Sequence, residues 1–403
     1  MKVDTMRKLD YFVGVPLCFA LTRLIRLSAL LRPWRRTQPK RVLFVELSEM
    51  GSAIIADPAM RKMRDTGTEL YFVIFGKNAP SLRLLGTVAE DNVFHINENG
   101  LVPLIGSTLR FLLWTRRNRI DTVIDLELFS RYSALLTGLS GANNRIGYYS
   151  FHNEGLYRGD MLSHNVAYNP HIHIAKNFVA LINAALAEEP ELPYSKSLIS
   201  DDEIKLAQAD VSEEQLAEMR QRVRDAYADY EETSHRIVLI NPNASELLIQ
   251  RRWMPERYAE LMRRILDSYE DVVVLITGAP AEREEAEALK AEVGRDRCVN
   301  FAGRVKFAEL PALYRISALM VSNDSGPGHF SAVTSMPSFI IFGPETPALY
   351  GSLGNSTPIF AGLACSPCVS AANHRKTPCH DNVCLQVITV EQVFTAITPT
   401  LQR

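Results

Sequence analysis

Apolar residues along the chain alternate between short continuous runs and segments with helical spacing. A run of strand length at 41–47 is followed by apolar positions at helical spacing over 54–63 and by a second run at 70–75. This order predicts a βαβ unit with buried parallel strands. Since the alternation continues to residue 139, the first half is predicted to be a doubly wound α/β domain.

A second series of the same kind begins at residue 236. Its predicted strands alternate with helical segments and cover 236–240, 272–276, 298–301, 319–321 and 338–342. Between the two series, residues 188–233 are rich in Glu, Asp, Ala and Gln, which predicts a connector with one charged helix over 202–230. Two doubly wound domains facing a cleft are therefore expected, with ligands at the carboxyl ends of the strands.

The first forty residues are both basic and apolar. Nine basic residues stand against only Asp4 and Asp10: Lys2, Arg7, Lys8, Arg23, Arg26, Arg32, Arg35, Arg36 and Lys40. A cleaved signal peptide is rejected because no small-residue cleavage site follows the apolar run at 11–21. A spanning helix is disfavoured because Arg23 and Arg26 interrupt it. Two alternatives remain: an amphipathic segment in the interface of an anionic bilayer, or a helix packed on the protein's own surface.

Overall composition excludes one class of partner. The 403 residues are 47% hydrophobic and 22% charged, with a net charge of -2 and a sequence pI of about 6.5, as in ordinary globular proteins. No zinc-finger, RNA-recognition or helix-turn-helix signature is present. Nucleic acid is therefore not expected as a partner.

The strongest chemical candidate follows the apolar run at 319–321, where small residues lead into a helix predicted to begin at His329. Backbone N–H groups in such a turn approach phosphate closely, and a helix start attracts anions. The candidate residues are Asp324, Ser325, Gly326, Gly328 and His329. Tight packing of the turn is the alternative explanation for its glycines.

Two further loops follow strands of the same domain. The first contains Asn243 and Ser245 and leads to Arg251 and Arg252, just before a helix. Paired arginines there can neutralise a diphosphate, although arginines at a solvated helix cap are the alternative. The second loop contains Thr277 and Gly278. Three strand-end loops thus converge on one crevice, which is predicted to be a nucleotide pocket.

Taken in order, these motifs resemble glycosyltransferase family nine, the lipopolysaccharide heptosyltransferases. They read Asn-Pro-Asn-Ala-Ser, Arg-Trp-Met-Pro-Glu-Arg-Tyr, Ile-Thr-Gly-Ala-Pro, Asn-Asp-Ser-Gly-Pro-Gly-His and Phe-Gly-Pro-Glu-Thr. The resemblance covers nearly the whole chain from residue 41. It implies the GT-B fold, metal-independent transfer with inversion and no catalytic cofactor. By position, Arg251 resembles the residue that contacts donor phosphate, and 342–346 resembles a loop that closes over the donor.

The resemblance also implies that successive parts of the chain have different roles. The predicted parts are a basic membrane-proximal segment at 1–38, a Rossmann-like acceptor domain at 39–187, a connector at 188–234, a Rossmann-like nucleotide-sugar domain at 235–387 and a helix at 388–403. The implied reaction moves a sugar, for which heptose from ADP-heptose is one candidate. The acceptor would be a lipid-linked, lipopolysaccharide-like or other envelope glycan. The enzyme is expected in the cytoplasm, peripheral at the inner face of the cytoplasmic membrane.

The N-terminal motif departs from the family pattern. Family members read Leu-Ser-Ser-Leu-Gly-Asp after the first strand, with the Asp as candidate base, whereas this chain has Ser52 at the matching position. Since serine is a poor base, Glu49 is predicted to substitute, with Glu46 and Asp57 as weaker candidates. A surface carboxylate is the alternative for Glu49. A non-catalytic donor-binding descendant and a sugar-nucleotide 2-epimerase therefore remain rival functions. His171 and His173, before a predicted helix, are either acceptor-side residues or helix-start or core residues.

Four cysteines crowd into a loop over 365–384. Cys365, Cys368, Cys379 and Cys384 have the spacing C-x2-C-x10-C-x4-C, with His374 and His380 as spare ligands. Three alternatives stay open: a structural zinc or related metal, free buried thiols, or disulfides, which cytoplasmic conditions disfavour. Any metal here is expected to be structural.

Overall fold

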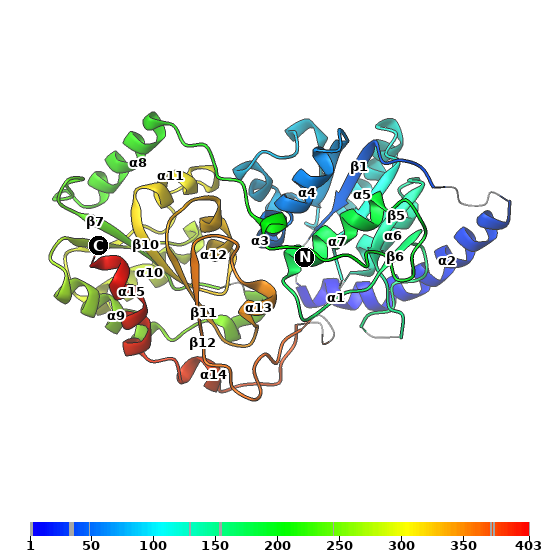
Figure 1. The fold of residues 1–403 in the computed structure, drawn as a ribbon. Coiled ribbons are helices and arrows are strands. Elements are labelled where there is room, and N and C mark those ends of the chain that lie inside the picture. The colour runs from blue at the N-terminus through cyan, green and yellow to red at the C-terminus, as the bar shows by residue number, and fades with distance from the viewer. Residues whose placement is uncertain are drawn as a thin grey trace. The chain divides into compact units, whose positions relative to one another are not determined.

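The computed structural model describes residues 3–31, 36–47, 49–128, 130–152, 155–244, 246–370, 373 and 375–402. The chain divides into two compact units, one formed by Met1–Lys205 with Ala371–His374 and the other by Leu206–Ser370 with Arg375–Arg403. Within the described ranges each unit holds one parallel six-stranded sheet with helices on its faces (Figure 1). The prediction of two doubly wound domains is confirmed. The finer domain bounds stay a prediction.

The sheet of the first unit has the order β3-β2-β1-β4-β5-β6. Its strands are β1 Arg41–Val45, β2 Glu69–Phe75, β3 Val93–Ile96, β4 Thr122–Asp125, β5 Asn144–Tyr148 and β6 His164–Val166. The helices are α1 Val3–Phe12, α2 Gly14–Leu31, α3 Met50–Ile55, α4 Asp57–Arg64, α5 Leu101–Arg117, α6 Arg131–Leu139 and α7 Ile174–Leu186, with 3-10 turns η1 Gly76–Leu84, η2 Glu90–Asn92 and η3 Asp202–Ile204. Strand β1 pairs with β2 and β4 and is covered on both faces, which explains its uninterrupted apolar sequence.

The sheet of the second unit has the order β12-β11-β10-β7-β8-β9. Its strands are β7 Arg236–Asn241, β8 Val272–Ile276, β9 Cys298–Asn300, β10 Ser317–Asn323, β11 Ser338–Phe342 and β12 Ser356–Phe360. The helices are α8 Glu213–Ala226, α9 Pro255–Ser268, α10 Arg283–Val293, α11 Leu310–Arg315, α12 Gly326–Phe330, α13 Pro347–Tyr350, α14 Val383–Gln386 and α15 Val390–Leu401, with 3-10 turns η4 Glu246–Arg251, η5 Pro280–Glu282, η6 Phe307–Glu309 and η7 Ser331–Val333. Trp253 and Tyr258 are among the largest fully buried side chains of this core.

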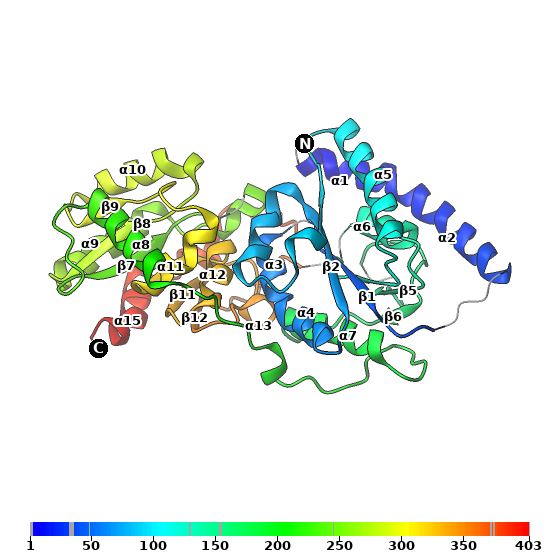
Figure 2. The same ribbon diagram turned by 90° about the horizontal axis from the view of Figure 1, so that it is seen from above.

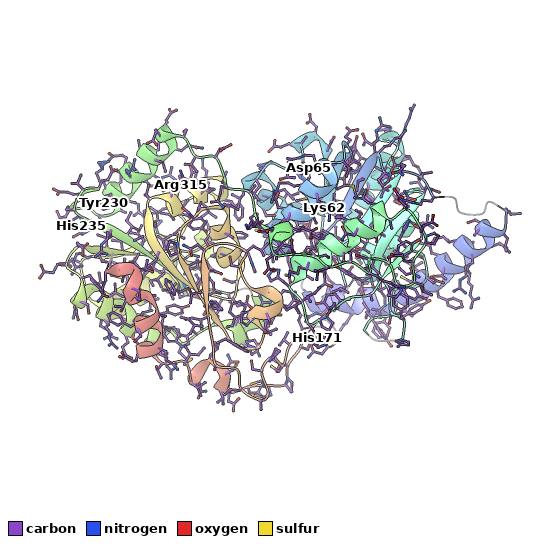
Figure 3. The ribbon with its side chains drawn as sticks, viewed as in Figure 1. Lys62, Asp65, His171, Tyr230, His235 and Arg315 are labelled. Carbon is purple, nitrogen blue, oxygen red and sulfur yellow. The ribbon has the colours of Figure 1, made fainter. Side chains whose placement is uncertain are left out.

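The predicted connector helix over 202–230 is wrong in its first half. Helix α8 begins only after Ser212, whose hydroxyl accepts from the Gln215 amide in a capping box. Upstream, the Ala209 amide donates to the Val333 carbonyl at 2.8 Å, so the segment before the cap bonds elsewhere instead of continuing a helix. The short turn η3 is held to α4 by a 2.8 Å ion pair between Glu203 and Lys62. Figure 3 labels Lys62.

Helices α1 and α2 lie against α6 through a narrow stripe of residues about four apart. Gly14 allows the closest approach, since a Cβ there would lie 2.8 Å from the Arg131 Cβ. Cys18 is fully buried, and the Thr22 hydroxyl accepts from the Asp160 amide at 2.9 Å. Packing on the protein's own surface is therefore confirmed for this stripe. Of the basic residues in this end of the chain, Lys2, Arg32 and Arg35 lie outside the described part.

Candidate functional site

The side chain of Asn323, at the end of β10, ties together three segments of the second unit. Its Oδ1 accepts from the Trp253 amide and from the Tyr258 hydroxyl, each at 3.0 Å, while its Nδ2 donates to the Pro242 carbonyl at 2.8 Å. Asn323 is completely buried, so these bonds satisfy a polar group that would otherwise destabilise the fold. They fix the chain at Trp253, and with it the preceding Arg251, beside the end of β10.

Arg251 reaches two buried carboxyl groups. Its Nη1 donates to the Asp324 carbonyl at 3.3 Å, and its Nε lies 3.8 Å from Asp324 Oδ2. Its Nη2 lies 3.7 Å from Oε1 of Glu345, in the loop after β11. Arg251 is 9% exposed, and both acids are 2% exposed. Charges so far from water persist only when oppositely charged groups surround them.

Arg375 adds a second guanidinium to this group. Its Nε lies 3.6 Å from Glu345 Oε1, and its guanidinium lies over the Tyr350 ring, 5.1 Å from the ring centroid. We call Arg251, Asp324, Glu345 and Arg375 the buried charge cluster. Sequence analysis placed Glu345 only within a closing loop and did not identify Arg375, because nothing local marks either residue as a partner of Arg251.

Burial changes how the two acids of the buried charge cluster titrate. It raises the pKa of Glu345 to about 8, an effect that Arg251 opposes and the charge of Asp324 reinforces. Burial also raises the pKa of Asp324, again opposed by Arg251. Two carboxyl groups this close retain a proton between them near neutral pH. With two guanidinium groups present, the cluster then carries a net positive charge, which suits a diphosphate.

We expect the thermal midpoint to fall more steeply between pH 5 and pH 9 in the wild type than in Glu345→Gln. The pKa of Glu345 is raised from its ordinary value of 4.5 to about 8, so the folded state binds one proton more than the unfolded state between these two pH values. The stabilisation is therefore complete below pH 4.5 and is lost as pH rises through 8. The glutamine side chain of the variant does not titrate in this pH range. Scanning calorimetry across this range measures the difference, and parallel slopes for the two proteins would contradict the assignment.

The two glycines of the predicted turn are explained by packing. A Cβ at Gly326 would lie 2.7 Å from the Phe330 ring, and one at Gly328 would lie 2.9 Å from Ile340 Cδ1. The Asp324 amide donates to the Ile341 carbonyl at 2.9 Å and is used within the fold.

Helix α12 starts at Gly326, not at His329 as predicted, and His329 lies half-buried in its last turn. The turn also contains Ser325, buried just before α12.

Other predicted donor residues are distributed around the same strand ends. A Cβ at Gly278 would lie 3.0 Å from Asn243 Nδ2, so these two loops meet. The Thr277 hydroxyl lies 3.2 Å from Asn241 Nδ2. Arg252 turns away from the buried charge cluster and donates to the Ala244 carbonyl at 3.2 Å. Only one arginine of the predicted pair therefore enters the cluster. Ser245 lies outside the described residues.

In the first unit, Glu49 is the residue before helix α3. The Ser52 hydroxyl donates to its Oε2 at 3.4 Å, and both residues are half-buried. A carboxylate thus lies next to the serine that replaces the family's aspartate. Asp57 is less suited to act as a base, because it is buried and bonds to both Arg61 and Thr87. Glu46 is buried as well, and Ser48 lies outside the described residues.

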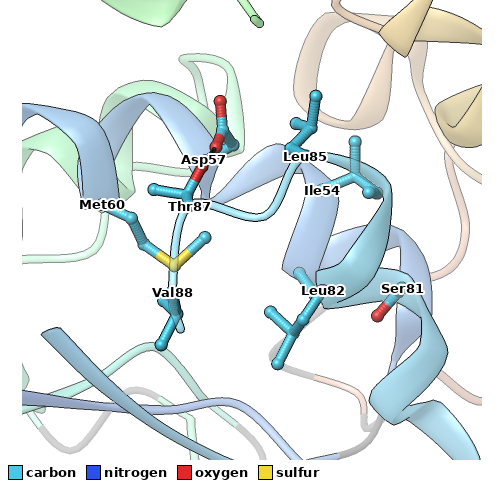
Figure 4. A pocket seen from close by; sticks show the side chains of 9 residues that line it. Ile54, Asp57, Met60, Ser81, Leu82, Leu85, Thr87 and Val88 are labelled. Atoms are coloured by element: carbon cyan, nitrogen blue, oxygen red, sulfur yellow. Dashed lines mark hydrogen bonds between the residues drawn. The ribbon is translucent and has the colours of Figure 1, made fainter. Parts of the chain in front are cut away.

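A small cavity beside Asp57 is lined by α3, α4, η1 and the segment after η1 (Figure 4). Among the residues that line it, Ile54, Met60 and Leu82 are apolar. Its volume of about 10 Å³ accommodates roughly one water molecule. It is therefore too small to bind a sugar.

Two buried acids at the end of β4, Asp125 and Glu127, were not predicted from the sequence. Glu127 accepts from the Leu47 amide at 2.8 Å and so holds the start of the loop that carries Glu49. Asp125 pairs with Arg158 and accepts from the Ser133 hydroxyl at 3.3 Å. Burial raises the pKa of Asp125, and Arg158 opposes this shift. The available signal was the acidic Asp-Leu-Glu at a predicted strand end.

The two histidines before α7 have different surroundings. His173 is the N-cap of the helix, and its Nδ1 accepts from the Ala175 amide at 3.1 Å. This confirms the helix-start interpretation for His173. His171 is exposed, and Figure 3 labels it.

The four loop cysteines are free thiols, so disulfides among them are excluded. Burial raises the pKa of Cys384, and the charges of Cys368, Cys379 and Cys365 raise it further. Within the described ranges, however, no three His, Cys, Asp or Glu side chains are arranged to hold a metal ion. His374 lies outside those ranges, and the structural metal stays a prediction.

Comparison with known proteins identifies the family of this two-unit fold. Residues 110–377 match the model of glycosyltransferase family 9 (heptosyltransferase), which is more than half of the chain. The chain belongs to glycosyltransferase family 9. The predicted resemblance and the assignment to a family of glycosyltransferase enzymes are thereby confirmed.

Relatives of this family 9 member include lipopolysaccharide heptosyltransferase 2 of Escherichia coli, 28% identical over 100 residues, and lipooligosaccharide heptosyltransferase 2 of Haemophilus influenzae, 31% identical over 101 residues. Each alignment covers 24% of this chain and 28% of the relative's length.

Solved structures extend the likeness over the whole fold. E. coli ADP-heptose lipopolysaccharide heptosyltransferase II superimposes with a TM-score of 0.67 at 18% identity, covering 90% of this chain and 98% of that chain. A family 9 glycosyltransferase from Veillonella parvula gives 0.66 at 17% identity, covering 92% and 99%. At such low identities these likenesses establish the fold, and the predicted GT-B class is confirmed.

Proposed function

We propose that this family 9 glycosyltransferase transfers a sugar from a nucleotide-sugar donor to a glycan acceptor, with inversion and without a catalytic metal. The observation that carries the proposal is the buried charge cluster at the strand ends of the second unit. Arg251 is held there by two buried acids and by the loop that Asn323 fixes. Heptose from ADP-heptose is the proposed donor sugar, since the E. coli structure with the same fold is an ADP-heptose heptosyltransferase.

Inverting transfer needs two chemical roles. The acceptor hydroxyl oxygen forms a bond to the anomeric carbon while the bond from that carbon to the diphosphate breaks, and the hydroxyl proton passes to a base. We assign the base to Glu49, whose carboxylate lies 3.4 Å from Ser52 Oγ. Arg251 and Arg375 stabilise the negative charge that develops on the departing diphosphate. Asn243, Thr277 and Gly278 are assigned to the nucleotide end of the donor.

The acceptor is proposed to be a lipid-linked glycan of the cell envelope, as in lipopolysaccharide synthesis, with the enzyme peripheral at the cytoplasmic face of the membrane. The exposed apolar faces of α1 and α2 support this location. For the cysteine loop, the C-x2-C-x10-C-x4-C spacing supports a structural metal. The Asn382 amide also donates to Cys379 Sγ at 3.4 Å. Metal analysis of the purified protein tests this part separately.

Donor binding is tested first. We expect Asp324→Ala and His329→Ala each to weaken binding of the preferred nucleotide sugar at least about tenfold, measured by calorimetry across ADP-, UDP- and GDP-sugars. Ser356→Ala, at the edge strand β12, is a control that should bind normally. Unchanged affinity in both site variants would sink the proposed donor site.

A second function is favoured by one specific observation, the serine at position 52. On this alternative no side chain replaces the family's aspartate as base, and the chain binds nucleotide sugar without transferring it. Donor binding without transfer or hydrolysis in the purified wild-type protein would establish this alternative.

A further inference from the structure

Exposed large apolar side chains concentrate on three helices of the first unit, α1, α2 and α5. On α1, α2 and the residue that joins them they are Tyr11, Phe12, Val13, Leu17, Phe19, Leu24, Leu27, Leu30 and Leu31. On α5 they are Leu101, Val102, Ile105, Leu109 and Leu113, each at least 50% exposed. Helices on the surface of a soluble protein normally show polar residues to water. A concentration of this size therefore indicates a partner.

Helix α5 is apolar on both sides. Ile105, Leu109 and Leu113 repeat every four residues and form one exposed stripe, while Phe111 on the other side is fully buried in the core. An exposed apolar stripe on a helix whose opposite side is already buried in the core is unusual for a protein surface and indicates a second contact of its own. The sequence analysis treated this segment only as a helix of the doubly wound domain.

The helices that carry these exposed apolar residues lie on the same side of the first unit. Met6 of α1 and Leu104 and Leu112 of α5 pack against one hydrophobic cluster, together with Tyr132 of α6. The Tyr132 hydroxyl lies 2.5 Å from the Thr108 hydroxyl of α5. Figure 2 shows α1, α2 and α5 along one side of this unit.

Residues Thr5–Leu31 are long and apolar enough to cross a membrane, judged by length and composition alone. The contacts that α1 and α2 make with the folded unit argue against a membrane-spanning helix. Asp10 accepts from the Arg131 and Tyr132 amides at 2.8 and 3.0 Å, and Arg26 pairs with Asp160. Because these contacts hold both ends of the segment to the folded unit, its outer face can meet a bilayer only from the side.

The charges on these helices distinguish between two candidate partners of the exposed apolar residues, a second copy of the chain and an anionic lipid bilayer. Neither α2 nor α5 contains an acidic residue, whereas α2 has Arg23 and Arg26, and α5 has Arg110, Arg116 and Arg117. A symmetric contact with a second copy would place these like charges together. Anionic headgroups would instead be attracted to the arginines while the apolar side chains enter the acyl boundary.

We propose that α5 and the α1–α2 segment form one membrane-docking surface that lies in the interface of an anionic bilayer. This inference rests on the proposed membrane location and adds α5 as a second contact. Two contacts from one rigid unit fix the orientation of that unit on the membrane, which a single helix does not.

Flotation of the full chain with vesicles of phosphatidylethanolamine and phosphatidylglycerol tests the role of α5. Ile105→Ser/Leu109→Ser should lower the vesicle-bound fraction at least about tenfold, because two side chains no longer enter the apolar layer. Leu198→Ser/Ile249→Ser removes two exposed apolar residues elsewhere and should bind like the wild type. Pure phosphatidylcholine vesicles should bind the wild type weakly.

Three results would overturn the proposal. Normal flotation of the α5 variant would limit docking to α1–α2, and no flotation of the wild type would exclude the bilayer. A wild-type dimer that dissociates in the α5 variant would assign the surface to a second copy. Donor binding, measured on the same preparations, should be equal in all variants. Absence of donor binding in the wild type would contradict the proposed function but would not bear on the membrane-docking surface.

Discussion

Glu49→Gln is expected to lower the rate of sugar transfer by about 10²- to 10⁴-fold, the usual contribution of a general base. The amide keeps the size of the side chain and can still accept a hydrogen bond from Ser52, but it does not take up a proton at neutral pH. Since Glu49 lies in the first unit and the buried charge cluster in the second, donor affinity should stay within a factor of about two. Single-turnover kinetics and donor calorimetry separate the two effects.

Position 52 supplies the matched controls. Ser52→Ala removes the 3.4 Å contact to Glu49 and should change the rate only a few-fold, since a hydroxyl does not serve as the base. Ser52→Asp in the Glu49→Gln background restores a carboxylate at the position where the family has one, and should recover part of the lost activity. Full activity of Glu49→Gln would assign the base to another group and refute this role.

The fold was predictable where strands are buried on both faces. Strands β1, β7 and β8 read as uninterrupted apolar runs because helices cover both sides of their sheets. Strands β5 and β6 escaped prediction because they are short and contain Asn, Arg and His. Strand β12, at the edge of its sheet, contains a proline and is only partly buried. Such strands are specified by the neighbours they pair with, which no local pattern reveals.

The site was predictable only as far as strand-end loops mark it. The pattern located Asp324 and Arg251 in such loops, since parallel strands end at one edge. The loop pattern alone did not distinguish Arg251 from Arg252, because the choice depends on the bond between the Trp253 amide and Asn323. Only the resemblance to the family singled out Arg251. The contribution of Arg375 depends on its 3.6 Å contact with Glu345, which is formed only by tertiary folding.

The N-terminal segment shows a third kind of limit. Its sequence allowed either a membrane surface or the protein's own surface as its partner. In the structure, a stripe of α2 centred on Cys18 packs against α6, while apolar residues such as Leu27 stay exposed. The two alternatives were therefore not exclusive, because one helix has several faces.

Arg251→Ala is expected to destabilise the second unit by about 3–5 kcal/mol, the usual cost of removing one partner of a buried ion pair. Asp324 and Glu345 would remain buried without the guanidinium that lies 3.8 and 3.7 Å from them. The thermal midpoint should fall by on the order of 10 °C, and donor affinity by at least about tenfold. Scanning calorimetry and donor titration at low temperature measure the two losses.

Arg252→Ala is the matched control for this prediction, because it removes the same side chain one residue further along. Arg252 contacts the Ala244 carbonyl and lies 3.6 Å from Glu285, at a half-exposed site, so its loss should cost less than about 1 kcal/mol. Arg251→Lys, which keeps the charge but loses the forked geometry, should fall between the two and keep the protein folded for donor titration. Equal effects of Arg251→Ala and Arg252→Ala would show that burial beside Asp324 and Glu345 gives Arg251 no special role, because the two variants differ only in that environment.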